Sequence, residues 1–306
     1  MRGSALIYVI FFFLLASILV SYFYLVKSTK ENNSTPTPTS PSIQIGMESE
    51  SENSEPISDS SIPFGLRFPT VEVICDYPIA ILWRKDLFGP NKNFSPGKAL
   101  LDKAESCGTK VVVRLFGYTK DIVGSGGKGL SISKWEDRID DFAGLIDPYV
   151  DNGTIIAHLT IDEPHDCKND WGNECPTPAE IEESGRISRE YWQALPTAIN
   201  TMPAYATTHY WKDIDYINFQ YSFHKGDLNK FIESALKVLN EGKVSNIFWS
   251  IQAAHGGGQD FGDRPMTPSE VEMVGRAICD TKKGLFVSFS SYREDIMTSE
   301  MVEAIN

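Results

Sequence analysis

The chain has 306 residues, of which 42% are hydrophobic and 23% are charged, and its formal net charge at pH 7 is −13. Nucleic acids and anionic membrane surfaces carry negative charge themselves, so we expect no nucleic-acid partner. The five cysteines are an odd number, so at least one of them has no partner within the chain.

The first thirty residues have the pattern of a membrane anchor. Residues 5–26 carry no charge, Arg2 and Lys27 flank them, and a bilayer takes about 20 apolar residues to cross. The residues Tyr22-Phe23-Tyr24 at the end of this stretch lack the small side chains of a signal-peptide cleavage site. We therefore predict an uncleaved transmembrane signal-anchor over residues 1–30, with the lipid bilayer as the partner of residues 5–26.

The composition changes twice after this anchor. Residues 31–63 are rich in Ser, Thr, Pro, Asn and Glu, a composition that buries too little apolar surface to fold, so we predict a disordered stalk. Residues 64–306 form a globular domain in this prediction. Their number is close to the ~250 residues of a typical single eight-stranded barrel.

Short apolar runs and helix-start signals alternate through residues 64–306. Strands are expected at Gly65–Phe68, Val71–Cys75, Lys110–Phe116, Thr154–Ile161, Thr197–Thr201, Tyr216–Tyr221, Asn246–Ile251 and Gly284–Phe289. Helices are expected at Ser95–Cys107, Ser133–Val150, Pro178–Gln193, Leu228–Asn240, Pro268–Thr281 and Ser299–Ile305. This alternation predicts a parallel sheet with helices outside it.

Polar residues alternate with apolar ones inside these strands. Asn218 and Gln220 alternate with Ile217, Phe219 and Tyr221, and His158, Thr160 and Asp162 alternate with apolar neighbours in the same way. An open sheet with helices on both faces has continuous apolar strands, whereas a closed barrel turns every second side chain inward. We predict the α/β class and a single (β/α)8 TIM-type barrel, with His158 and Thr160 deep in its lumen. The side chains expected at its functional end are Arg114, Asp162, Glu163, Asn200, Gln220, Gln252 and Ser290.

Asp162 and Glu163 end an apolar strand at Pro164, which cannot continue a ladder of hydrogen bonds. Barrel enzymes place their catalytic groups at the carboxyl ends of strands. No His or Cys group has metal-ligand spacing, and Gly256-Gly257-Gly258 lacks the basic helix start of a phosphate site, so we expect neither metal nor cofactor. Lys225 alone is too little to indicate a Schiff-base enzyme.

Amide, acid and aromatic side chains of this kind suit a neutral ligand with many hydroxyl groups, because aromatic rings stack on sugars and amides bond their hydroxyls. We expect a carbohydrate ligand or substrate. The predicted contacts are Arg114, Asn200, Gln220, Tyr221, Gln252, Tyr292 and Trp171.

Most of residues 95–293 resembles the clan of retaining (β/α)8 glycoside hydrolases of the cellulase and mannanase type. The segment Ala104 to Leu115 is similar to the second helix and third strand of that clan, and Ile161-Asp162-Glu163-Pro164 to its fourth strand, which ends Asn-Glu-Pro. Phe219-Gln220-Tyr221 resembles the sixth strand, whose aromatic touches the sugar. The resemblance implies that Glu163 is the general acid/base.

Two residues depart from the pattern of the clan. Asp162 stands where the clan has Asn, and Gln252 stands about where it has the nucleophilic Glu, although Gln cannot form a glycosyl ester. A second carboxyl is needed about 5–5.5 Å away for retention or 6.5–9.5 Å for inversion. Asp162 and Asp76 are the preferred candidates, and Asp260, Glu294 and Asp295 are also available. The alternative is a non-catalytic carbohydrate-binding surface protein on the same barrel.

Cys167 and Cys175 bracket the short loop that follows the acid pair. A disulfide between them would fix this loop and fits an extracytoplasmic location, whereas two free thiols would fit a reducing compartment. We expect the disulfide, and a membrane-anchored protein whose globular domain lies outside the cytoplasm at the cell surface.

Overall fold

The computed structural model describes residues 62–67, 69–87, 93–116, 121–126, 128–168, 171–172, 174–254, 264–290 and 300–301. The predicted anchor, nearly all of the predicted stalk, most of the predicted last helix, and Tyr292, Asp260, Glu294 and Asp295 lie outside these ranges. The chain divides into two compact units, Met1–Ile57 and Ser58–Asn306, and the fold below belongs to the second. Within the described ranges, no helix has both the length and the apolar character needed to cross a bilayer.

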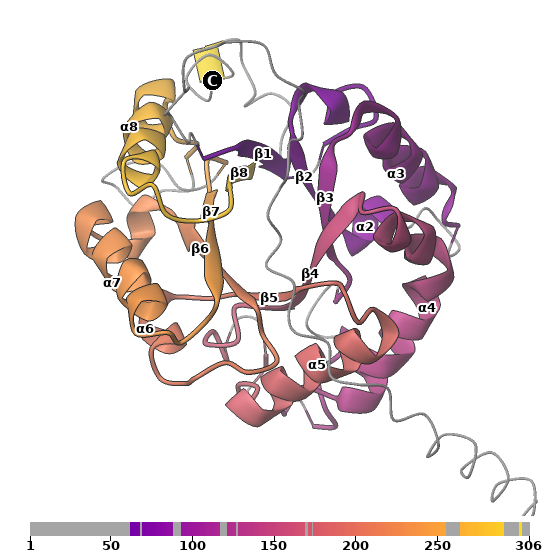
Figure 1. Cartoon of the computed structure of the whole chain (residues 1–306). Helices are drawn as coiled ribbons and strands as arrows, with labels where there is room; N and C mark the ends of the chain where they lie inside the picture. Colours follow the sequence, from indigo (N-terminus) through magenta and orange to yellow (C-terminus); the bar gives the residue numbers. More distant parts are fainter. Residues whose placement is uncertain are drawn as a thin grey trace, which may run out of the picture. The chain divides into compact units, whose positions relative to one another are not determined.

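Eight parallel strands close into a barrel in chain order, and β8 pairs with β1. Figure 1 shows the strands inside a ring of helices. The strands are β1 (Phe64–Arg67), β2 (Ile79–Trp83), β3 (Lys110–Arg114), β4 (Ile155–Asp162), β5 (Thr197–Asn200), β6 (Tyr216–Tyr221), β7 (Asn246–Ile251) and β8 (Val287–Ser290). The predicted α/β class and single (β/α)8 barrel are confirmed.

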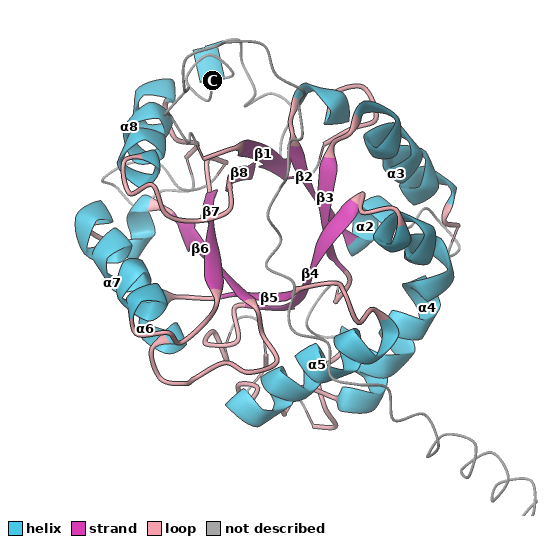
Figure 2. Cartoon of the chain, in the orientation of Figure 1, coloured by secondary structure: helices cyan, strands magenta, loops and turns pink. Residues whose placement is uncertain are grey.

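The helices follow the strands on the outside of the barrel (Figure 2). They are α2 (Arg84–Leu87), α3 (Ser95–Cys107), α4 (Ile132–Asp151), α5 (Pro178–Tyr191), α6 (Pro203–Ala206), α7 (Leu228–Asn240) and α8 (Pro268–Cys279), with 3₁₀ turns η1 (Ile74–Asp76) and η4 (Phe223–Lys225). Capping boxes of Thr177 with Glu180 and of Thr267 with Glu270 begin α5 and α8, each followed by proline. The sequence prediction missed α2 and α6, which are too short to show a helical period.

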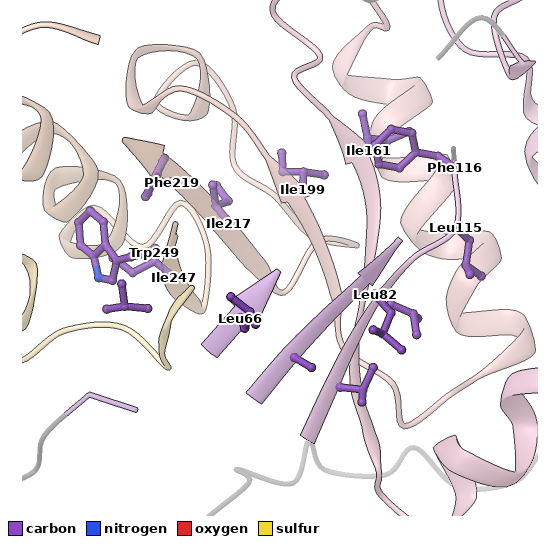
Figure 3. Close-up of a cluster of buried hydrophobic side chains, with 14 of the residues drawn as sticks. Leu66, Leu82, Leu115, Phe116, Ile161, Ile199, Ile217, Phe219, Ile247 and Trp249 are labelled. Atoms are coloured by element: carbon purple, nitrogen blue, oxygen red, sulfur yellow. The ribbon is translucent and has the colours of Figure 1, made fainter. Parts of the chain in front are cut away.

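The apolar core has two parts, one inside the barrel and one between the barrel and the helices. The outer part is the larger, and Figure 3 shows some of it, including Leu66, Ile199 and Phe219. Alternate strand residues, together with Phe286 directly before β8, fill the lumen at its amino-terminal side; the strand residues are Ile79, Ile81, Val112, Ala157, Leu159, Ala198 and Phe248. The lumen is thus a packed interior that supports whatever lies at the ends of the strands.

A layer of polar strand residues lies next to these apolar ones, toward the carboxyl ends of the strands. The hydroxyl of Ser250 donates to Asn218 Oδ1 at 2.8 Å and lies 2.7 Å from the hydroxyl of Ser288. All three side chains are completely buried. Because their polar atoms bond one another, this layer carries polar groups without the cost of leaving them unpaired.

The second strand is not where the sequence predicted it. Residues 71–73 form a turn and η1 follows, because the carbonyl of Thr70 accepts from the N–H of Ile74 at 3.0 Å. Pro78 has no N–H to give to a ladder, and β2 begins directly after it. Asp76 consequently precedes β2, at the amino end of the barrel, and the prediction that it follows a strand was wrong.

Strand β4 contains a bulge that changes which side chains face inward. Its register with β5 shifts by one residue, and Thr160 is the extra residue. His158 faces the helices, where its ring stacks on Trp135 with 5.3 Å between ring centres, whereas Asp162 faces the lumen. The prediction that His158 and Thr160 share a face with Asp162 was wrong, because simple alternation does not allow for an inserted residue.

Candidate functional site at the mouth of the barrel

The carboxyl ends of the strands, termed the mouth here, carry a ring of inward side chains. These strand ends are the site of catalysis in (β/α)8 enzymes. The ring consists of Arg67 on β1, Trp83 on β2, Arg114 on β3, Asp162 on β4, Asn200 on β5, Gln220 on β6 and Gln252 directly after β7. Hydrogen bonds and an ion pair join six of its members into two networks, and the guanidinium groups of Arg67 and Arg114 both lie over the ring of Trp83.

The first network is built around Asp162. Arg114 forms an ion pair with its Oδ2, and the amide of Asn200 donates to its Oδ1 at 2.5 Å. Asn218 in turn donates to Asn200 Oδ1 at 3.0 Å. The guanidinium of Arg114 also lies over the ring of Trp83. The structure therefore brings together the predicted residues Arg114, Asp162 and Asn200.

Both carboxylate oxygens of Asp162 are occupied by protein donors, and its side chain is only 13% exposed. A general acid or base needs an oxygen within reach of the substrate. The geometry thus makes Asp162 an anchor for Arg114 and Asn200, in contrast to the expectation that it is the second catalytic carboxyl.

The second network is a row of polar groups across the other side of the mouth. Arg67 donates to Gln220 Oε1, and the amide of Gln220 donates to Gln252 Oε1. The N–H of Gln252 is fixed by the carbonyl of Tyr221 at 2.9 Å. Sequence reasoning missed Arg67, although the strand expected at Gly65–Phe68 already put an inward arginine two residues after Gly65.

Glu163 follows β4 with a backbone φ of +43°, in the left-handed region that residues other than glycine rarely occupy. Its N–H donates to the carbonyl of Asn200 at 2.8 Å, and its own carbonyl accepts from Asp166 at 2.9 Å. Such a conformation costs about 1–3 kcal/mol and persists where the surroundings enforce it, as at functional sites. Here it directs the carboxylate of Glu163 to Lys225, whose Nζ lies 3.4 Å from Oε1.

The loop after Glu163 is tied down from two sides. Cys167 and Cys175, the pair expected from the sequence, form a disulfide across it. The indole of Trp171 donates to the carbonyl of Asp162 at 3.2 Å and is completely buried. Trp171 therefore packs beneath the loop and offers no surface to a ligand, contrary to the predicted substrate contact.

Lys225 belongs to η4, the turn that follows β6. His165 comes two residues after Glu163 in the sequence, and its Nδ1 lies 3.0 Å from the hydroxyl of Thr201. Burial lowers the pKa of His165, and the charge of Lys225 lowers it further. Among the described residues, the ion pair of Glu163 is made with Lys225.

Three other predicted residues do not join the mouth. Tyr221 faces outward from β6, packs on Phe231 with 5.2 Å between ring centres, and donates its hydroxyl to the carbonyl of Gly226 at 2.8 Å. Asp76 lies at the opposite end of the barrel, so it cannot act with Glu163. Tyr292 is outside the described residues.

Asp86 is a carboxyl near the mouth that sequence reasoning missed. It lies in α2, directly after β2, and accepts from the N–H of Trp83 at 2.8 Å. Burial raises its pKa, with opposing contributions from that hydrogen bond and from Lys85 and Arg114. Among the described residues no group of three His, Cys, Asp or Glu side chains is arranged to hold a metal ion.

No protein-family model and no curated protein matches the chain. Solved structures do match. A psychrophilic glycoside hydrolase family 10 endo-β-1,4-xylanase is 11% identical, with a TM-score of 0.57 over 80% of this chain and 96% of that one. An intracellular xylanase from Thermoanaerobacterium saccharolyticum is 11% identical, with a TM-score of 0.55 over 80% and 95%. A family 10 glycoside hydrolase from Paenibacillus barcinonensis is 11% identical, with a TM-score of 0.51 over 78% and 88%.

The chain is therefore a (β/α)8-barrel protein similar in fold to glycoside hydrolases. At this level of identity the likeness concerns the fold. The argument for activity depends on the residues at the mouth.

Proposed function

We propose that the protein is a glycoside hydrolase-like enzyme in which Glu163 is the general acid/base. The observation that carries the proposal is the enforced left-handed backbone of Glu163 at the carboxyl end of β4. Its side chain is 28% exposed, against 13% for that of Asp162. A strained, held and accessible carboxyl at the catalytic end of a barrel is suited to proton transfer.

The proposed substrate is a neutral saccharide. Arg114, Asn200 and Gln220 form a buried polar floor of the mouth, and Gln252 and the ring of Trp83 are partly exposed there. Variants of the Thermoanaerobacterium saccharolyticum xylanase have been crystallised with xylotriose and xylotetraose. Xylo-oligosaccharides are accordingly the first ligands to try.

In this proposal Glu163 gives its proton to the glycosidic oxygen as the bond to the anomeric carbon breaks. Gln252 follows β7, about where the resembling clan has its nucleophile, and an amide cannot form the covalent ester. The second carboxyl must therefore come from another position, and Asp76 is excluded by its place at the opposite end.

The decisive experiment is hydrolysis of xylan, β-glucan, mannan and a series of aryl glycosides by the whole chain in mild detergent. Wild type is compared with Glu163→Gln, which keeps the size of the side chain and removes the acid. Turnover that disappears in the variant establishes Glu163 as catalytic. Turnover that survives in Glu163→Gln contradicts the role given to it.

The competing function is a non-catalytic carbohydrate-binding protein. The observation in its favour is that Gln220 and Gln252 bond each other at the place where a nucleophile would be expected. Absence of turnover on every substrate, together with saccharide binding that Glu163→Gln leaves intact, would establish this function instead.

The proposal includes a membrane tether and an extracytoplasmic location. Residues 5–26 support the tether because they are uncharged and long enough to cross a bilayer. Two disulfides, Cys75–Cys107 and Cys167–Cys175, support an oxidising location, since such bonds are rare in the cytosol. Protease accessibility of the globular part in intact cells tests this location.

A further inference from the structure

Lys225, in η4 after β6, approaches Glu163, which directly follows β4. The Nζ of Lys225 lies 3.4 Å from Glu163 Oε1, and the two side chains are 22% and 28% exposed. Within the described part of the chain, Lys225 has no ion pair except this one. The ion pair is made through Oε1 of Glu163.

The turn that carries Lys225 is fixed by three hydrogen bonds. The N–H of Lys225 donates to the carbonyl of Ser222 at 2.9 Å, and the N–H of Gly226 donates to the carbonyl of Phe223 at 3.1 Å. The hydroxyl of Tyr221 donates to the carbonyl oxygen of Gly226 at 2.8 Å. Gly226 has a φ of +87°, which glycine adopts without strain.

Both partners of the pair are therefore held by backbone bonds. Glu163 is held by Asn200 and Asp166, and Lys225 by the turn. A cation that is fixed before the substrate arrives, as Lys225 is, needs no reorganisation during the reaction, so its effect on a charge that develops at Glu163 is large.

We propose that Lys225 is a positioning residue for Glu163, which fixes Oε1 and stabilises the carboxylate that forms when Oε2 gives up its proton. This inference rests on the proposed function. In the step concerned, the proton of Glu163 moves to the glycosidic oxygen. The electron pair of the breaking carbon–oxygen bond stays with that oxygen, water forms the new bond to the anomeric carbon, and the proton that this water loses returns to the carboxylate of Glu163.

The ammonium group of Lys225 interacts weakly with a protonated Glu163 and strongly with its carboxylate. An interaction that strengthens toward the transition state raises kcat and leaves KM almost unchanged. The benefit depends on the leaving group, because a good leaving group departs without being protonated.

The experiment measures kcat and KM of the whole chain in mild detergent for aryl glycosides whose leaving groups differ in acidity. Lys225→Met is compared with Lys225→Arg, which keeps the charge, and with Lys230→Met, the same change on the exposed side of α7. Thermal unfolding checks that each variant is folded.

For Lys225→Met we expect kcat to fall at least about 10-fold on poor leaving groups. This loss should be smaller than the roughly 10²–10⁴-fold loss expected when general acid catalysis is removed altogether. KM should stay within about twofold, activated leaving groups should be nearly unaffected, and Lys225→Arg should recover most of the loss. Lys230→Met should match wild type.

A loss of equal size on all leaving groups, or one that appears in KM, overturns the inference and makes Lys225 a binding residue. Lys225→Met as active as wild type overturns it too. A wild-type protein that cleaves none of the glycosides overturns the proposed function, and this inference falls with it.

Discussion

The guanidinium of Arg114 lies 3.5 Å from the ring centre of Trp83, its register partner on the neighbouring strand β2. The same guanidinium pairs with Asp162 on β4. One side chain thus bridges three consecutive strands at the mouth, so the geometry of the ring depends on it.

Replacing Arg114 by Met should destabilise the protein by about 3 kcal/mol or more, because Asp162 would be left enclosed without its cation. Chemical denaturation of both proteins measures this difference. The matched control is Arg276→Met, which removes an arginine from an exposed pair with Glu272 on α8. Exposed pairs contribute little, so a loss in the control as large as in Arg114→Met would contradict the argument.

The two disulfides should differ in what their removal costs, one mainly in stability and the other in stability and activity. Replacing Cys75 and Cys107 by Ser opens a longer loop, and by chain entropy costs about 4 kcal/mol, against about 2.5 kcal/mol for Cys167 and Cys175. Only the second pair fixes the loop after Glu163, so only its removal should reduce hydrolysis. Denaturation and activity of the two double variants give the answer, and a larger activity loss from the first pair would refute it.

The backbone of Glu163 predicts an unusual order of stabilities. At φ +43° a side chain is strained and glycine is not, so Glu163→Gly should be more stable than Glu163→Ala by up to about 1 kcal/mol. At Lys103, inside helix α3, the order should reverse, with Gly about 1 kcal/mol worse than Ala. Denaturation midpoints of the four variants test this, and the same order at both positions would disprove the strain.

His158 should make stability depend on pH. Burial lowers its pKa to about 3, from an ordinary value of 6.5. Below pH 6.5 the unfolded chain takes up a proton at His158 that the folded protein does not accept until about pH 3. The free energy of unfolding should therefore fall through this window, by up to about 1.4 kcal/mol per pH unit from this residue.

In His158→Gln the slope of unfolding free energy against pH between 6.5 and 4 should be smaller than in wild type. Gln keeps a polar atom for Ser188, whose hydroxyl lies 2.6 Å from His158 Nδ1. Equal slopes in the two proteins would show that His158 is protonated in the folded state.

The barrel was predictable because the sequence pattern that produces it recurs along the chain. Short apolar strands, helix-start signals and inward polar residues are each found several times, so one misplaced strand does not change the predicted fold. Elements with strong local signals, such as β6, α7 and β7, have the predicted bounds. The segment at 71–75 failed because its β-branched residues suit a strand while the bonds to Thr70 make a turn.

The mouth was predictable only in part. Arg114, Asn200, Gln220 and Gln252 follow from alternation, and Glu163 from the end of β4. Trp171 lies in a loop, which suggested a ring available to a ligand, yet the structure buries it. Its indole donates to the carbonyl of Asp162, a contact that only the folded loop creates. The contact of Lys225 with Glu163 joins residues far apart in the chain, which local patterns cannot reveal.

The bulge at Thr160 determines which way the side chain of Asp162 points. If residues 159–162 all paired one to one with β5, even alternation would turn Asp162 toward the helices. Because Thr160 is left out of the pairing, Asp162 lies opposite Asn200 and faces the lumen. Arg114 and Asn200 therefore share a carboxylate only because β4 has one residue more than its partner strand.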